Sequence, residues 1–94
     1  MFAFEYPLSG DYITVYFDMK KFYFDSSEIL VIVDRNKRKG GCEEIVEKMK
    51  TLKFVKVHQV IVLLDCFFDT DLLQYYILNI VYPILINYKK SLML

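Results

Sequence analysis

The chain has 94 residues, enough for one hydrophobic core, so we expect a single domain over residues 1–94. Apolar side chains make up 55% of the chain, against about 45–50% in typical soluble domains, so an unusually large apolar surface must be buried. Twelve basic and twelve acidic side chains cancel, which excludes a global field that would recruit nucleic acid or a membrane surface. Any electrostatic recognition must therefore be local.

The amino terminus and the cysteines bear on the cellular setting. Residues 1–7 contain no basic region followed by a long apolar stretch, so we expect no secretory signal and a cytoplasmic protein. Cys42 and Cys66 are too few for a zinc site or a disulfide framework. We interpret them as buried thiols that act as small apolar residues, with a single bridge between them as the alternative.

Three short segments near the amino terminus predict strands. Residues 2–6, 12–17 and 22–24 are rich in aromatic and β-branched side chains, and turn-forming residues separate them at 7–11 and 18–21. We expect these segments to form antiparallel hairpin strands.

Two continuous apolar runs, 29–33 and 60–64, come next, and an aspartate follows each of them. The second run belongs to a strand that we expect to begin at about residue 55. Unbroken apolar runs are typical of strands covered on both faces, so we expect two central parallel strands. Between the runs, apolar residues recur at the spacing of one helical face. These residues are Cys42, Ile45, Val46, Met49 and Leu52. Strand, helix and strand together predict a right-handed βαβ unit.

A last helix is predicted over residues 70–89. Polar residues at 69–71 supply N-cap chemistry, and Lys89 and Lys90 place positive charge at the other end. Pro83 lacks a backbone donor, so we expect a kink there. The fold class is therefore α/β in the mixed α+β sense. N-terminal antiparallel β-hairpin strands join a β-α-β-α unit, which gives a mixed sheet of about four strands and two helices.

The last helix is apolar around most of its circumference, which is more than one small sheet can cover. We expect a homodimer packed through this helix, or another protein partner on the same face. The residues predicted for that interface are Leu73, Tyr76, Ile77, Ile80 and Ile84. A membrane span is not favoured, because residues 72–88 fall short of the roughly 20 mostly apolar residues that a span needs.

A basic loop follows the first apolar run. Residues 35–41 carry four cations and two glycines directly ahead of the predicted helix. Cations and backbone amides at a helix start can hold phosphate, so we expect this loop to contact phosphate groups, foremost those of nucleic acid. The predicted contact residues are Arg35, Lys37, Arg38, Lys39, Gly40 and Gly41. The alternative is a solvated turn, since the loop matches neither the P-loop nor the G-x-G-x-x-G pattern.

Aspartates offer a second kind of site. If the two apolar runs are parallel strands, Asp34 and Asp65 lie at one edge of the sheet, with Asp69 and Asp71 nearby. Their carboxylates could there hold a hard cation such as Mg²⁺. The alternative is ordinary turn and cap chemistry, and our leading interpretation includes neither a metal nor a cofactor.

One segment combines an acidic residue before the first apolar run, an acidic residue after it and a lysine soon afterwards. These residues are Asp25 or Asp18, then Asp34, then Lys37. The pattern resembles the core of PD-(D/E)xK nucleases. The resemblance implies a metal-dependent nuclease in which Asp25 or Asp18 ligates the metal together with Asp34, and Lys37 is catalytic. The chain departs from the family pattern because Asn36 stands where the family has its lysine.

Aromatic residues and the lone histidine complete the candidates. The aromatic residues of the predicted hairpin are Tyr12, Tyr16, Phe17, Phe22, Tyr23 and Phe24. We interpret them as core or interface packing, with a stacking platform for single-stranded nucleic acid as the alternative. His58 is interpreted as structural. The sequence thus predicts a non-enzymatic binding protein, with a metal-dependent nuclease and a protein-interaction module as alternatives.

Overall fold

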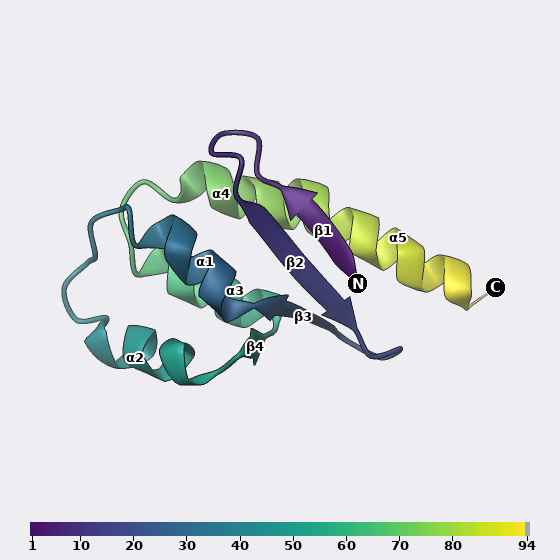
Figure 1. The fold of residues 1–94 in the computed structure, drawn as a ribbon, viewed down its shortest axis with the longest axis horizontal. Helices are drawn as coiled ribbons and strands as arrows, with labels where there is room; N and C mark the ends of the chain where they lie inside the picture. The colour runs from purple at the N-terminus through teal and green to yellow at the C-terminus, as the bar shows by residue number, and fades with distance from the viewer. Residues whose placement is uncertain (94) are drawn as a thin grey trace.

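A computed structural model describes residues 1–93, which form a small mixed α+β domain with a four-stranded sheet (Figure 1). The strands are β1 (Phe2–Glu5), β2 (Tyr12–Phe17), β3 (Phe22–Asp25) and β4 (Phe54–Val55). The helices are α1 (Ser26–Val33), α2 (Glu43–Thr51), α3 (Val57–Asp65), α4 (Asp71–Tyr76), the π-helical segment η1 (Ile77–Val81) and α5 (Tyr82–Leu92). The predicted fold class is therefore confirmed.

The N-terminal strands pair as the sequence predicts. The sheet has the order β1-β2-β3-β4, and every neighbouring pair is antiparallel. Because side chains alternate along a strand, Ile13 and Val15 of β2 and Phe24 of β3 point into the core. Tyr12 and Tyr16 point the other way and are exposed. Helices therefore cover one face of the sheet and leave the other open.

The two apolar runs assigned to parallel strands are helices, so the predicted βαβ unit is wrong. Residues 29–33 belong to α1 and residues 60–64 belong to α3. A short apolar run without periodicity fits a buried helix as well as a buried strand, so the sequence pattern alone did not distinguish the two. The deciding signal precedes the run, where Asp25 Oδ1 accepts a hydrogen bond from the Ser27 amide at 3.0 Å and caps α1.

A carboxylate joins α1 to the sheet. β3 ends before it has paired the whole of β2, and Thr14 of β2 bonds instead to Glu28 of α1. Glu28 Oε1 accepts from the Thr14 amide at 2.7 Å, and Oε2 accepts from the Thr14 hydroxyl at 2.9 Å. The Glu28 side chain thus takes the place of a neighbouring strand.

Helix α2 forms where the helical spacing predicts it. Val46 and Met49 of this helix are buried, and its charged residues face outward. The chain then enters β4, in which Val55 pairs with Phe24 of β3 at the edge of the sheet. The segment between the two apolar runs therefore contributes the expected helix, and the strand expected from about residue 55 is limited to Phe54–Val55.

The last helix runs without a break through α4, η1 and α5. Its buried side chains are spaced four residues apart: Leu73, Ile77, Val81 and Leu85. The π-helical turn η1 lies directly before Pro83, which stands at the start of α5, and a wider turn leaves room for a residue that has no backbone donor. Within residues 1–93, no helix is both long enough and apolar enough to span a membrane.

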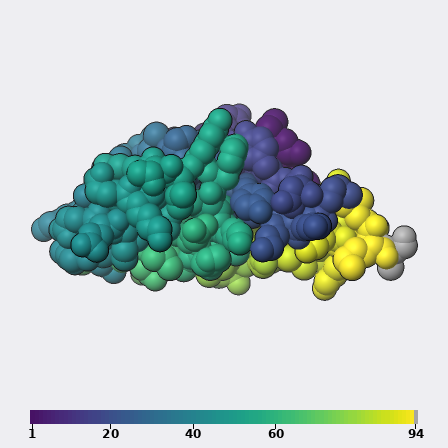
Figure 2. Space-filling view, turned by 90° about the horizontal axis from the view of Figure 1, so that it is seen from below, coloured from purple at the N-terminus to yellow at the C-terminus, as the bar shows by residue number. Residues whose placement is uncertain are grey.

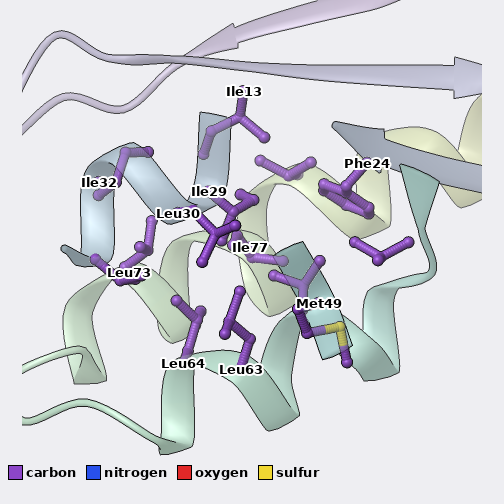
Figure 3. Packing of buried hydrophobic residues seen from close by; sticks show 14 of the residues in the cluster. Ile13, Phe24, Ile29, Leu30, Ile32, Met49, Leu63, Leu64, Leu73 and Ile77 are labelled. Atoms are coloured by element: carbon purple, nitrogen blue, oxygen red, sulfur yellow. The ribbon is translucent and has the colours of Figure 1, made fainter. Parts of the chain in front are cut away.

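Side chains from the sheet and the helices meet in one core (Figure 3). Ile13 and Phe24 from the sheet approach Ile29 of α1, and Leu63 and Ile77 approach from α3 and the last helix. All five are fully buried. Burying one such side chain contributes about 1.5–3 kcal/mol, so this cluster fixes the positions of the elements that carry the candidate sites.

Candidate functional site

The basic loop between α1 and α2 has a well-defined backbone. The Lys39 amide donates to the Cys66 carbonyl at 2.8 Å, and the Phe68 amide donates to the Lys37 carbonyl at 2.8 Å. Asn36 Nδ2 donates to the Phe68 carbonyl at 2.7 Å. The backbone of the loop is therefore tied to the connection between α3 and α4.

The four cations of the loop have different surroundings. Arg35 forms a bidentate ion pair with Asp11, in which Nη2 lies 3.0 Å from Oδ1. This contact is the main reason that the pKa of Asp11 is lowered. The Arg38 guanidinium lies over the Phe67 ring, and the Lys39 ammonium lies over the Phe68 ring. Arg35, which the sequence predicted to contact a ligand, thus pairs with a carboxylate of the protein, and its side chain is 55% exposed.

Three cations of the loop remain available for a ligand. Lys37 is exposed, and no carboxylate of residues 1–93 forms an ion pair with Lys37, Arg38 or Lys39. Gly40 and Gly41 are exposed, and Gly41 has a φ of 82°, a conformation that glycine adopts without strain. The loop therefore holds its charged side chains on a fixed backbone, and the conformation at Gly41 favours glycine.

The start of α2 has no side-chain cap and carries acidic residues. Cys42 occupies the N-cap position, and its side chain forms no capping hydrogen bond. Glu43 and Glu44 lie in the first turn and already place negative charge at the positive end of the helix. Acidic side chains therefore already offset part of the positive potential at this end of the helix.

The aspartates do not form a metal cluster. Asp34 and Asp65 are exposed at the C-terminal ends of two helices, and Asp65 accepts from Gln74 Nε2 at 2.9 Å. Among the residues that the structure describes, no three His, Cys, Asp or Glu side chains are arranged to hold a metal ion. The predicted shared sheet edge is absent because its two strands are helices.

The residues of the nuclease pattern are also separated. Asp25 begins α1 and Asp34 follows its last residue, so at 1.5 Å per residue they lie about 13 Å apart along the helix. Metal–oxygen bonds of about 2.0–2.6 Å cannot bridge that distance. Asp18 lies in the β2–β3 turn, where Oδ1 accepts from the Lys20 and Lys21 amides. The structure therefore does not bring the predicted ligands together.

The predicted interface residues divide between core and surface. Leu73 and Ile77 are buried beneath the last helix. The Tyr76 hydroxyl donates a hydrogen bond to the Glu5 carbonyl at 3.0 Å, and the Tyr76 side chain is half-buried. Ile80 and Ile84 are 43% and 48% exposed, so these two alone are free to contact a partner.

The aromatic residues of the hairpin divide in the same way. Phe17, Phe22 and Phe24 face the helices, and Tyr12, Tyr16 and Tyr23 face outward. Tyr16 and Tyr23 line a shallow apolar hollow of about 360 Å³ together with Phe54 of β4. Packing thus accounts for half of the set, as we interpreted it, and the other half forms an open aromatic surface.

Sequence reasoning missed a cavity lined by basic side chains. It has a volume of about 220 Å³ and lies between the β2–β3 turn, the start of α3 and α5. Figure 2 shows the blue, teal and yellow parts of the chain adjoining on one face of the molecule. The basic residues that line it are Lys20, Lys21, Lys56, His58 and Lys89, and we call this cavity the lysine pocket. These residues come from three distant segments. Their only shared signal in the sequence is charge, which does not reveal that they meet.

No protein-family model, curated protein or solved structure matches this chain.

Proposed function

We propose that this chain is a non-enzymatic binding protein that contacts the phosphate groups of nucleic acid through its basic loop. One observation carries the proposal: Lys37, Arg38 and Lys39 lie on a backbone tied to residues 66–68, and none of them has a carboxylate within 4.0 Å among residues 1–93. Because the loop is already ordered, binding costs it less conformational entropy than it would cost a mobile turn.

An exposed aromatic ring beside these cations narrows the class of nucleic acid. Phe68 is 46% exposed, and the Lys39 ammonium lies 5.5 Å from its ring centroid. Aromatic rings that stack unpaired bases next to cations that meet phosphates are typical of single-strand binding. The proposed ligand is therefore single-stranded nucleic acid.

The salt dependence of binding tests this proposal. Fluorescence anisotropy of labelled single-stranded DNA and RNA should give affinities that fall linearly with the logarithm of KCl concentration. Replacing Lys37, Arg38 and Lys39 by alanine together removes up to three phosphate contacts. The slope should fall in magnitude by about 2, because each phosphate contact of a single strand contributes about 0.7.

A matched control removes the same charge elsewhere. Lys48→Ala, Lys50→Ala and Lys90→Ala combined change three exposed lysines outside the loop. This variant should keep the wild-type slope. If the loop variant binds as tightly as the wild type, or if both variants lose affinity equally, the basic loop is not the binding site.

We further propose that the chain forms a homodimer through an exposed apolar flank of its last helix, beside the buried stripe. Four apolar side chains spaced four residues apart are exposed there. They are Ile80, Ile84, Tyr88 and Leu92. A continuous apolar line of this kind is typical of a helix face that packs against another protein. The second candidate function, a protein-interaction module, uses the same surface with a different partner.

A cytoplasmic setting belongs to the same proposal. Cys42 and Cys66 are both free thiols. Free thiols persist in reducing compartments, whereas oxidising ones favour disulfides. Location of a tagged copy of the protein in its own cells tests this part directly.

A further inference from the structure

We propose that the lysine pocket is a separate binding site for a phosphate dianion, either inorganic phosphate or the phosphate group of a small phosphomonoester. The inference goes beyond the proposed function, because the pocket and the basic loop share no residue. It stands on the shape of the cavity, on the lack of ion pairs to its lysines among residues 1–93 and on the way α3 begins.

The backbone around the pocket is fixed. Asp18 Oδ1 accepts from the Lys20 amide at 2.9 Å and from the Lys21 amide at 2.7 Å, which defines the β2–β3 turn. Lys89 Nζ donates to the Lys20 carbonyl at 2.6 Å and joins α5 to that turn. The cavity of about 220 Å³ is much larger than the roughly 10–15 Å³ that a single water needs.

No lysine of the pocket forms an ion pair with a carboxylate of residues 1–93. Among residues 1–93, the ion pairs within 4.0 Å join Arg35 to Asp11 and Lys50 to Glu47, and neither involves the pocket. Contact with the Lys21 side chain, followed by repulsion from its charge, lowers the pKa of Lys56. Ammonium groups that repel one another across a cavity are stabilised when an anion enters it.

The start of α3 adds to this positive potential. Lys56 occupies the N-cap position, where residues with a side-chain oxygen are preferred, and lysine can only donate hydrogen bonds. The first turn of α3 contains no acidic residue. The positive end of this nine-residue helix therefore lies next to cations, although negative charge is preferred at a helix N-terminus. An anion in the pocket would supply that negative charge.

The lining favours phosphate over a monovalent anion. A phosphate dianion carries three acceptor oxygens, and lysines from separate segments bind it as independent point charges. His58 and Tyr82 add polar atoms to the wall. Phe22 and Ile86 supply an apolar side that an organic substituent on the phosphate would contact.

Titration followed by NMR tests this inference. Inorganic phosphate and phenyl phosphate are added at constant ionic strength in KCl while amide resonances of the folded protein are recorded. The Val57 and His58 amides should shift and saturate. Lys56→Gln and Lys89→Gln should each weaken binding by about tenfold, the loss expected for one charge-assisted hydrogen bond.

Lys90→Gln is the matched control, because Lys90 is an exposed neighbour of Lys89 outside the pocket. It should bind phosphate like the wild type. Shifts that never saturate, or equal weakening in Lys89→Gln and Lys90→Gln, would show mere charge screening and overturn the inference. Circular dichroism checks that the variants are folded, and the two pocket variants serve as independent tests.

Two further measurements distinguish inorganic phosphate from a phosphomonoester as the ligand, and the lysine pocket from the basic loop as its site. Tighter binding of phenyl phosphate than of inorganic phosphate assigns the pocket to a phosphomonoester, and equal binding assigns it to free phosphate. The variant with Lys37, Arg38 and Lys39 replaced by alanine should bind phosphate normally even if it loses nucleic acid. Loss of phosphate binding in that variant would place the anion at the basic loop and would overturn the inference.

Discussion

The two thiols of the chain have different chemical environments. Cys66 ends α3 and is 2% exposed, and Cys42 is half-buried before α2. Burial, then contact with Cys42, raises the pKa of Cys66 to about 11. The two thiols are therefore neighbours, as a bridge between them requires, and both are free in this structure.

This environment predicts unequal reactivity. The thiolate is the nucleophile, and with a pKa of about 11 only about 0.1% of Cys66 is ionised at pH 8. Iodoacetamide should therefore modify Cys42 well before Cys66 in the native protein, as mass spectrometry of peptides would show. Cys42→Ser provides a chain with Cys66 as its single thiol, and it should react only after unfolding. Equal rates for the two thiols would contradict this description.

The pH dependence of stability has a defined sign at Cys66. Its folded pKa of about 11 lies above the ordinary value of about 8.5, so the folded state favours the neutral thiol. This contribution to stability is complete below pH 8.5 and is lost as the pH rises toward 11. Comparing the wild type with Cys66→Ala over that range isolates the effect, because the alanine variant lacks it.

The contacts of single charged residues were harder to predict from the sequence than the burial of single apolar residues. Arg35 belongs to the basic loop by sequence, yet its partner Asp11 lies 24 positions earlier and was assigned to a turn. Lys37, Arg38 and Lys39 form no ion pair with a carboxylate of residues 1–93. The difference arises because ion pairing depends on contacts through space, which residue order does not reveal.

At the level of elements, the contact between β2 and α1 depends on a single side chain, Glu28. Glu28 accepts two hydrogen bonds from Thr14, one of them from a backbone amide that a neighbouring strand would otherwise pair. A glutamine has one acceptor oxygen in place of two. It therefore cannot satisfy both donors in the same way.

Glu28→Gln should lower the free energy of unfolding by about 1.5–3 kcal/mol, the range for hydrogen bonds to charged groups. Urea denaturation followed by circular dichroism measures the change. Glu44→Gln, at an exposed position of α2, is the control and should stay within about 0.5 kcal/mol of the wild type. Equal stability of Glu28→Gln and Glu44→Gln would show that the contact between β2 and α1 does not depend on this carboxylate.

The predicted elements differed in how far local pattern could decide them. The alternation in β2 and the helical spacing in α2 each correspond to one structure, and both elements formed. The runs that became α1 and α3 carry no period, so their state depended on what they pack against. The carboxylate site failed with them, because it required two parallel strand ends.

The molecule as a whole is flat, with extents of 46 × 26 × 16 Å. Its radius of gyration is 13.3 Å, slightly above the value of about 12 Å for a compact domain of this length. Helices cover only one face of the sheet (Figure 1). A thin molecule with a high apolar content leaves apolar side chains exposed on both sides.

The oligomeric state tests how this exposed surface is used. We expect light scattering coupled to size exclusion to give the mass of a dimer, and Ile80→Glu with Ile84→Glu to give a folded monomer. Leu8→Glu, an exposed apolar position in the β1–β2 turn, is the control and should remain dimeric. A wild-type chain that stays monomeric over a wide concentration range would contradict the homodimer and favour a different protein partner.

The sequence by itself determined the mixed α+β class, the antiparallel N-terminal strands, α2 and the last helix. These features depend on periods and turns that extend over a few neighbouring residues. The tertiary structure decided the helical state of α1 and α3, the pairing of Arg35 with Asp11 and the assembly of the lysine pocket. Each of these depends on which distant segments share a core or a surface, and burial and charge act through space.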